Sequence, residues 1–370
     1  MNILQISSAS SFAGGERYVA DLTNSLTARG HNLYVAVRPR SPLIRHLRLP
    51  PERIVVLPLR NALDVQSAHE LDRFVRRQRI EVVHAHMARD YSLASYAARR
   101  NRQTKFIATR HVLFQLNRFH RHTLARATRV IAVSRAVANE LRSQGIVSDS
   151  QIAVIPNGIA VERFSRARAG FDREQFLRSM GLPADCLLVG SIGELRTLKR
   201  HDDFIRAAAL IVKKFPETQF VLAGVDTAAS GEVRRGLEKL VVQLGLKDCF
   251  YFLGWLEEAE RLLCALDVFV SASETESFGL VIAEAMAAGT AVVATETEGA
   301  KEVIEDQKTG VLVPIGNVGR IAEAVTTLLE DDEKRREIGA RAQEQANARF
   351  SLKRMVDEIE KIYLAADERG

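Results

Sequence analysis

The sequence predicts an α/β protein of two domains, each a parallel sheet covered by helices. A chain of 370 residues ordinarily forms more than one domain. Short β-branched runs alternate with segments whose apolar residues recur every three or four positions, which is typical of alternating strands and helices. Charge also divides the chain: residues 1–170 carry 27 Lys and Arg against 11 Asp and Glu, and the remainder carries 25 against 35.

Composition narrows the class of protein. Apolar residues make up 46% and charged residues 26%, as in soluble globular proteins. The three cysteines are widely spaced, which argues against a disulfide framework or a zinc site and fits a reducing compartment. The first residues lack the basic segment of a secretory signal, and no apolar run reaches the roughly 18 residues of a membrane span. We therefore expect a cytoplasmic location.

Each half of the chain supplies its own strands. Those expected in the first half are residues 3–7, 33–37, 54–58, 81–86, 105–110 and 130–134. Those expected in the second half are residues 187–193, 219–224, 249–254, 268–273 and 291–296. Helical periodicity lies between them, as in 16–30, where Gly30 stands at the position of a C-terminal cap, and in 202–212.

The domain boundary is expected within residues 160–184, a polar stretch with few β-branched residues. We assign residues 1–165 to a first domain and residues 180–350 to a second. The last helix, about 352–370, has one apolar face and is expected to pack back on the first domain. The excess of basic residues in the first domain predicts an anionic partner, although it could also serve solubility alone.

A polar turn follows the buried strand at 268–273. It carries Glu274, Glu276 and Ser277, and ligands of open parallel sheets bind at the carboxyl ends of strands. The amides of Phe278, Gly279 and Leu280 open the next helix, and such free N–H groups attract phosphate.

Glu284 lies inside that helix and could accept hydrogen bonds from the hydroxyls of a ribose. The alternative makes Glu276 a charge that stabilises the helix dipole and Glu284 a solvated residue. Apolar neighbours such as Ile282 and Met286 argue against solvation.

The segment 276–295, ESFGLVIAEAMAAGTAVVAT, resembles the E-x7-E signature of the retaining GT-B glycosyltransferases of family 4. Further segments resemble motifs of that family in the same order: AGGERYVADL (13–22), VVHAHM (82–87), ATRHV (108–112), VIAVSRA (130–136), VIPNGI (154–159), LGW (253–255) and KTGVLVP (308–314). The resemblance covers nearly the whole chain. It implies two Rossmann-like domains that face each other across a cleft, an acceptor-side domain first and a donor-binding domain second.

In the first domain the resemblance implies roles for two glycines and three histidines. Gly14 and Gly15 would let backbone amides approach a diphosphate, because they lack side chains. His111 would contact the donor sugar or its phosphate; alternatively it is a satisfied polar residue at a strand end. His84 and His86 share one face of a strand, which could suit a metal, but no third ligand and no DxD motif accompany them. We interpret these two as lining the acceptor side of the cleft.

In the second domain the resemblance implies an arginine and a lysine that hold the diphosphate. Lys199 stands at the lysine position, and Gly193 begins the loop. Glu194 occupies the usual arginine position, so Arg196 is the expected substitute. Gly254 would bind the base through its backbone. The sequence also departs from the family at Ala160, where a carboxylate is common, and at 297–303, which keeps Gly299 but lacks a proline and a second glycine.

The resemblance implies the retaining, metal-independent transfer of a sugar from a nucleoside-diphosphate sugar to a glycan or glycolipid, in cell-envelope or polysaccharide biosynthesis. The expected catalytic residues are His111, Arg196, Lys199 and Glu276, with positive charge stabilising the departing diphosphate. No cofactor is expected, because the nucleotide sugar is a substrate. The alternatives are a sugar-nucleotide epimerase or phosphorylase of the same fold, or a nucleotide-sugar-binding protein without turnover.

Residues 110–129 mix apolar side chains with many Arg and His. They predict a basic, partly apolar helix that contacts an anionic membrane surface or a phosphorylated glycolipid. The alternative is a helix with core apolar residues and solvated arginines. Nucleic acid is disfavoured, because no binding module is recognised.

Overall fold

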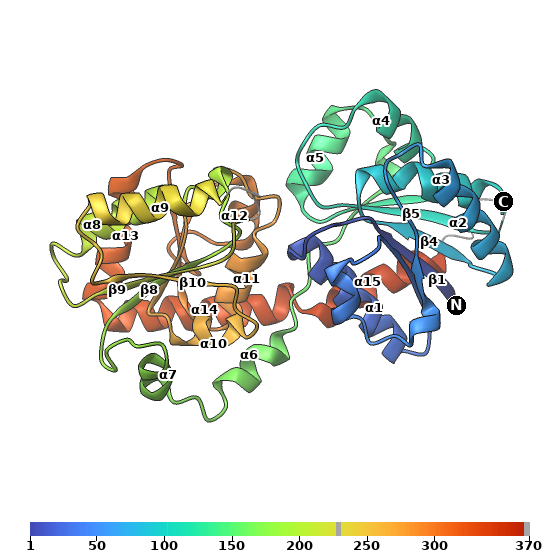
Figure 1. Ribbon diagram of the computed structural model, residues 1–370. Helices are drawn as coiled ribbons and strands as arrows, with labels where there is room; N and C mark the ends of the chain where they lie inside the picture. Colours follow the sequence, from blue (N-terminus) through green and yellow to red (C-terminus); the bar gives the residue numbers. More distant parts are fainter. Residues whose placement is uncertain (102, 227–230, 366–370) are drawn as a thin grey trace. The chain divides into compact units, whose positions relative to one another are not determined.

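The computed structural model describes residues 1–101, 103–226 and 231–365, which form two compact units (Figure 1). Unit 1 comprises Met1–Gly158 and the last helix, and unit 2 comprises Ile159–Ser351. Unit 2 is thus one continuous segment inserted between two pieces of unit 1. Residues 366–370 of the expected last helix lie outside the described residues.

Unit 1 contains a seven-stranded sheet in the order β3-β2-β1-β4-β5-β6-β7, and its described pairings are parallel. Its strands are β1 (Asn2–Ser7), β2 (Asn32–Val37), β3 (Ile54–Val56), β4 (Val82–Ala85), β5 (Lys105–Arg110), β6 (Arg129–Ala132) and β7 (Ile152–Val154). Its helices are α1 (Gly14–Ala28), α2 (Val65–Arg77), α3 (Tyr91–Arg99), α4 (Arg118–Leu124), α5 (Arg135–Ser143) and α15 (Leu352–Ala365).

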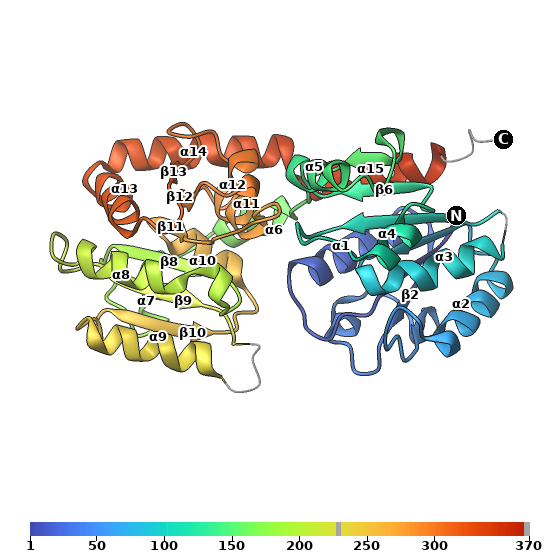
Figure 2. The same cartoon turned by 90° about the horizontal axis from the view of Figure 1, so that it is seen from above.

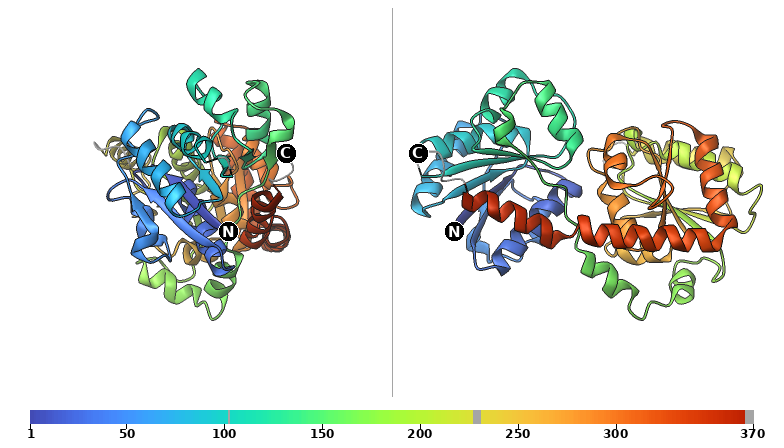
Figure 3. Two further views of the ribbon diagram at one scale, coloured as in Figure 1. Left: turned by 90° about the vertical axis from the view of Figure 1, so that its right-hand side faces the viewer. Right: turned by 180° about the vertical axis from the view of Figure 1, so that it is seen from behind.

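The helix α15 is part of the core of unit 1 and packs beside α1 (Figures 1 and 3). Met355, Val356, Ile359 and Tyr363 on this helix are fully buried against the sheet. The Nζ atom of Lys105 on β5 also donates a hydrogen bond to the Tyr363 carbonyl oxygen, 3.0 Å away. Burial of its apolar face explains why this helix packs on unit 1, although unit 2 separates it from the rest of unit 1 in the sequence.

Unit 2 contains a six-stranded parallel sheet in the order β10-β9-β8-β11-β12-β13. Its strands are β8 (Leu188–Ile192), β9 (Gln219–Ala223), β10 (Phe250–Gly254), β11 (Val268–Ser271), β12 (Ala291–Thr295) and β13 (Val311–Val313). Its helices are α6 (Val161–Arg168), α7 (Arg173–Ser179), α8 (His201–Ile211), α9 (Glu232–Gln243), α10 (Ala259–Ala265), α11 (Leu280–Ala287), α12 (Glu298–Val303), α13 (Val318–Glu330) and α14 (Asp332–Arg349).

Helices cover both faces of the second sheet (Figure 2). Helix α8 packs against α9 and α13 on one face, and α11 packs against α10 and α14 on the other. Strands buried on both faces explain the continuous apolar runs at β11 and β12. The prediction of parallel sheets covered by helices is confirmed for both units.

The structure differs from the sequence-based expectation in two segments. Helix α6 packs on α10, where the Arg163 guanidinium lies 2.9 Å from the Glu260 carboxylate, so residues 159–165 lie with unit 2. The expected helix over 110–129 is wrong in extent, because only Arg118–Leu124 are helical. Asn117 caps this short helix by accepting a hydrogen bond from the His120 amide at 2.9 Å, and the preceding segment is irregular.

Candidate functional site

In unit 2 the chain order reverses between the neighbouring strands β8 and β11, since β9 and β10 lie on one side and β12 and β13 on the other. Ligands of open α/β sheets bind at such a switch point, outside the carboxyl ends of the strands. The loops that follow β8 and β11 meet there, because the Glu274 amide donates a hydrogen bond to the Leu198 carbonyl oxygen at 2.8 Å. These two loops carry most of the site residues predicted in unit 2.

Lys199 and Glu276 form an ion pair at this switch point. The Lys199 Nζ atom lies 2.6 Å from Oε1 of Glu276, and the Ser273 hydroxyl donates to the same oxygen at 2.7 Å. The Lys199 side chain is 27% exposed and the Glu276 side chain 11%, so both remain partly accessible to a ligand. Both hydrogen bonds end on Oε1 of Glu276. Among the described residues, no side-chain hydrogen bond ends on the other carboxylate oxygen, Oε2.

Backbone packing holds Glu276 in place. The Gly299 amide donates a hydrogen bond to the Glu276 carbonyl oxygen at 3.0 Å. A Cβ atom at Gly299 would lie 2.6 Å from that oxygen and 2.7 Å from the Phe278 nitrogen, closer than contacts allow. Only glycine therefore fits this position, although the sequence around it departs from the family pattern.

The helix α11 begins directly after this turn. Gly279 adopts a left-handed conformation (φ 86°), which suits glycine and turns the chain into the helix at Leu280. The Phe278 ring packs edge to face on Phe350 in the core, so this residue offers a ligand its backbone only. Glu284 is half-buried on α11, which is consistent with the expectation that it is not a freely solvated residue.

Three glycines bring the neighbouring loops into backbone contact. The Gly193 amide donates to the Ala223 carbonyl oxygen at 2.9 Å, and the Gly224 amide donates to the Gly254 carbonyl oxygen at 2.7 Å. A Cβ atom at Gly224 would lie only 1.8 Å from the Gly193 carbonyl oxygen. Sequence reasoning selected Gly193 and Gly254 but missed Gly224, although all three end a predicted strand.

Arg196 lies in a different environment from Lys199. Its guanidinium is 3.4 Å from the Glu194 carboxylate, and its side chain is 55% exposed. Arg196 and Glu194 line an open pocket of about 530 Å³ together with Asp226 and Val233. The loop therefore brings Lys199, and not Arg196, into contact with Glu276.

In unit 1 the predicted histidines lie together at the carboxyl ends of β4 and β5. The ring centroids of His84 and His86 are 4.2 Å apart, and those of His86 and His111 are 5.8 Å apart. The Tyr18 ring from α1 packs edge to face on His111 at 4.8 Å. Burial lowers the pKa of His84 and of His111 to about 3 and the pKa of His86 well below its usual value, so these rings are neutral at pH 7.

The two glycines of the first loop begin α1. The Glu16 carboxylate accepts a hydrogen bond from the Ala13 amide at 2.9 Å and so fixes the start of the helix. A Cβ atom at Gly15 would meet nothing within 4 Å. Packing therefore does not require glycine there, and the approach of a ligand to Gly14 and Gly15 stays a prediction.

Asp90 is a functional candidate that sequence reasoning missed. It follows β4 in unit 1, is fully buried, and accepts a hydrogen bond from the Ser8 amide at 3.0 Å. Burial raises the pKa of its carboxyl to about 7. Ser8 follows β1, so this contact joins the loops at the switch point of the first sheet.

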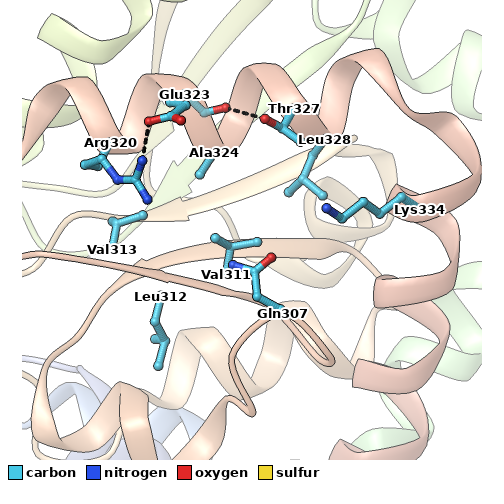
Figure 4. Close-up of a pocket in the computed structure, with 10 residues that line it drawn as sticks. All are labelled: Gln307, Val311, Leu312, Val313, Arg320, Glu323, Ala324, Thr327, Leu328 and Lys334. Carbon is cyan, nitrogen blue, oxygen red and sulfur yellow. Dashed lines mark hydrogen bonds and ion pairs between the residues drawn. The ribbon is translucent and has the colours of Figure 1, made fainter.

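A smaller pocket of about 120 Å³ lies along the edge strand β13 (Figure 4). The side chains of Arg320, Lys334 and Gln307 surround it, and Arg320 is paired with Glu323 at 2.6 Å. None of the predicted site residues lines it. Within the described ranges, no group of three or more His, Cys, Asp or Glu side chains could hold a metal ion, and no helix has the length and apolarity to span a bilayer.

Two family models match the chain. The model of glycosyl transferases group 1 matches residues 172–345, and that of glycosyltransferase family 4 matches residues 12–163. Together they cover most of both units.

Curated relatives match over different lengths. The N-acetyl-alpha-D-glucosaminyl L-malate synthase of Bacillus anthracis is 29% identical over 322 residues, which are 83% of this chain and 81% of that protein. The D-inositol 3-phosphate glycosyltransferase of Thermomonospora curvata is 36% identical over 225 residues, 58% of this chain. This chain spans about half the length of that relative (51%). The lipopolysaccharide core biosynthesis glycosyltransferase LpsE of Rhizobium meliloti is 27% identical over 93% of this chain and 94% of its own length.

Solved structures share the fold. A glycosyltransferase from Rickettsia africae superposes with a TM-score of 0.88 at 20% identity, over 100% of this chain and 99% of that one. The Anabaena protein HepE, solved with UDP and glucose, gives a TM-score of 0.85 at 22% identity, over 99% and 100% of the two chains. The fold class expected from the sequence is confirmed.

Proposed function

This chain belongs to the group 1 glycosyltransferases, family 4, and we propose that it transfers a sugar from a nucleoside-diphosphate donor with retention of configuration and without a metal ion. The acceptor in this proposal is a hydroxyl group of a glycan or glycolipid. The transfer of a sugar to an acceptor follows from the family; the donor, stereochemistry and metal independence are the proposal.

The ion pair between Lys199 and Glu276 carries this proposal. An ammonium group has three N–H donors, so Lys199 can keep one hydrogen bond to Glu276 and offer the others to phosphate oxygens. A fixed cation beside the leaving diphosphate stabilises the charge that develops as the glycosidic bond breaks. The Oε2 atom of Glu276 can meanwhile accept a hydrogen bond from a sugar hydroxyl. Lys199 would thus supply the charge for which other transferases use a metal.

Relatives support the donor class and the pathway. HepE has been solved in complex with UDP and with UDP-glucose, which supports a nucleoside-diphosphate sugar as the donor. LpsE acts in lipopolysaccharide core biosynthesis, as its name states, which supports a role in assembling cell-envelope or polysaccharide glycans.

Donor hydrolysis by the purified protein tests the proposal. We expect slow release of nucleoside diphosphate from one member of a panel of UDP-, GDP- and ADP-sugars. EDTA should not change the rate of release. The sugar released first, observed by NMR, should have the same anomeric configuration as the sugar of the donor. Loss of activity in EDTA would refute metal independence, and an inverted anomer would refute retention. Thermal stabilisation by a donor without any release would identify a binding protein, and a donor converted to its epimer would identify an epimerase.

The basic segment 110–129 is proposed to contact an anionic membrane or a phosphorylated acceptor. The aromatic side chains of Phe114 and Phe119 are 59% and 42% exposed. Arg118, the neighbour of Phe119 in the sequence, is exposed as well. Exposed aromatic residues among cations favour an anionic bilayer surface. Co-sedimentation with anionic vesicles at low salt should be lost in the Phe114→Ser/Phe119→Ser variant, and absence of wild-type binding would exclude the membrane contact.

A further inference from the structure

Tyr363 joins α15 to the histidine cluster of unit 1. Its hydroxyl oxygen lies 2.5 Å from Nδ1 of His84 and 3.2 Å from Nε2 of Gln5 on β1. His84 continues the contacts through its Nε2 atom, 2.7 Å from the Thr109 hydroxyl. Gln5 continues them through its Oε1 atom, 2.6 Å from Nε2 of His86. These five side chains form one hydrogen-bonded chain inside the unit.

The direction of each hydrogen bond follows from counting protons. The Gln5 amide nitrogen can only donate, so it donates to the Tyr363 oxygen, and its carbonyl Oε1 can only accept, so Nε2 of His86 carries a proton. Burial raises the pKa of Tyr363 above its usual range, so its hydroxyl keeps its one proton. That proton goes to Nδ1 of His84, because the Gln5 amide already donates to the same oxygen.

The Nδ1 atom of His86 is therefore left without a proton. Burial lowers the pKa of this ring well below its usual value, so the ring carries one proton only, and Nε2 holds it. His86 is 5% exposed, and its Nδ1 atom has no hydrogen-bond partner among the described residues. The Nε2 atom of His111, whose ring centroid is 5.8 Å away, lacks a partner as well. A buried acceptor without a partner costs free energy unless a ligand supplies a donor.

We propose that Tyr363 is a positioning residue that, through Gln5, fixes His86 in the tautomer with a bare Nδ1 atom, ready to accept a hydrogen bond from a hydroxyl of the bound sugar or acceptor. The part that concerns the ligand rests on the proposed function; the part that concerns the tautomer does not. Tyr363 does not touch the ligand in this arrangement; it acts on His86 through Gln5 and contacts His84 directly.

The direction in which the Tyr363 hydroxyl donates its proton determines the tautomers of both His84 and His86. If the Tyr363 hydroxyl donated to a reversed Gln5 amide, the amide nitrogen would face His86, and Nδ1 of His86 would have to carry the proton. His84 would then protonate on Nδ1 and accept from Thr109. The two tautomers are thus linked, and removing the Tyr363 hydroxyl removes the link between them.

Nitrogen NMR on protein labelled with 15N-histidine tests the tautomer directly, through the different shifts of protonated and bare ring nitrogens. Wild type should show His86 protonated on Nε2 alone, whereas Tyr363→Phe should show both tautomers of His86. Tyr34→Phe is the matched control, because its hydroxyl contacts Gln78 on the surface of the same unit and should leave the His86 signals unchanged. A bare Nε2 in wild type, or unchanged tautomers in Tyr363→Phe, would overturn the proposal.

The fold should survive this substitution. The Lys105 bond to Tyr363 uses the backbone oxygen, and Met355, Val356 and Ile359 keep α15 in the core. Equal circular dichroism for the two variants establishes this before the NMR is read. Kinetics then address the ligand: Tyr363→Phe should raise KM about 2–10-fold, the worth of one hydrogen bond, with kcat little changed. Absence of transferase activity would refute the proposed function and leave the NMR result standing.

Discussion

The two units place different chemistry at the same point of the same fold. In unit 2 the switch point holds a partly exposed ion pair, Lys199 with Glu276. In unit 1 it holds buried, neutral rings, whose histidine pKa values burial lowers. A fixed charge suits the stabilisation of a leaving diphosphate, whereas neutral acceptors suit the orientation of hydroxyl groups. Under the proposed function, unit 2 would supply the charge and unit 1 the orientation.

The largest effect is expected when the positive charge of Lys199 is removed from the switch point of unit 2. Lys199→Ala should lower kcat by about 10²–10³-fold, the usual loss for one donor to a developing anion. Lys308→Ala is the matched control, because Lys308 is exposed and pairs only loosely with Glu305, at 3.8 Å. Steady-state kinetics with a donor accepted by wild type measure both variants. Wild-type turnover in Lys199→Ala would assign the charge of the site to another residue.

Gly299→Ala tests whether backbone packing positions Glu276. The added Cβ atom would collide with the Glu276 carbonyl oxygen, so we expect a loss of about 1–3 kcal/mol in the free energy of unfolding and a fall in kcat. Gly319→Ala on α13 is the control, since its Cβ atom would lie 3.6 Å from the nearest atom. Urea unfolding compares the two variants, and equal midpoints would show that the turn can move without cost.

Asp90 tests the claim that the buried polar groups at the switch point of unit 1 are kept uncharged. Its folded pKa of about 7 exceeds the usual 3.8, so the folded state binds the proton more tightly. The contribution of Asp90 to the free energy of unfolding should therefore be fully present below about pH 4 and be lost as pH rises from about 4 to 7, by up to about 1.4 kcal/mol per pH unit.

Asp90→Asn should lack this loss, because the amide stays neutral and can still accept from Ser8. Urea midpoints across that pH range measure it. Asp149→Asn, at a carboxylate whose side chain is 79% exposed, should follow wild type. If Asp90→Asn and wild type change in parallel with pH, the carboxylate is already ionised in the folded protein.

The smallest effect is expected at Ser273. Its hydroxyl donates to Glu276 Oε1, but Lys199 contacts the same atom, so Ser273→Ala should lower kcat/KM by about 10-fold or less. Thr327→Val is the control, because Thr327 lies at an exposed position of α13 and its hydroxyl donates to the Glu323 carbonyl oxygen of the same helix. In the Lys199→Ala background the effect of Ser273→Ala should change, because the two residues share one partner. Additive losses would show that they act on Glu276 independently.

Local pattern predicted most of the fold. Residues 105–110 form a strand with the bounds expected, and Gly30 has the left-handed conformation (φ 88°) of a helix-ending glycine. The strand β7 was missed because it has only three residues, all half-buried, and its apolar run is too short to stand out from the neighbouring loops. The helix expected over 110–129 was too long, because composition alone does not reveal that Asn117 begins a new helix.

The candidate site was predicted less completely. Motif positions selected Lys199 and Glu276, but nothing in the sequence shows that residues 77 positions apart form an ion pair, since the contact depends on β8 and β11 being neighbours. Ser273 was missed because the expected strand 268–273 included it, whereas in the structure β11 ends at Ser271 and Ser273 belongs to the loop. Arg196 was chosen by its place in the motif, and the structure pairs its side chain with Glu194.

The insertion of unit 2 between two pieces of unit 1 has a consequence for synthesis. The ribosome makes Met1–Gly158 first, then all of unit 2, and only afterwards the residues that complete the first core. The nascent first unit therefore waits, with the surface beneath α15 uncovered, for about 190 residues (Ile159–Ser351) to emerge and fold. A ribosome that stalls before Leu352 leaves a complete unit 2 attached to an incomplete unit 1, and such a chain exposes apolar surface that chaperones bind.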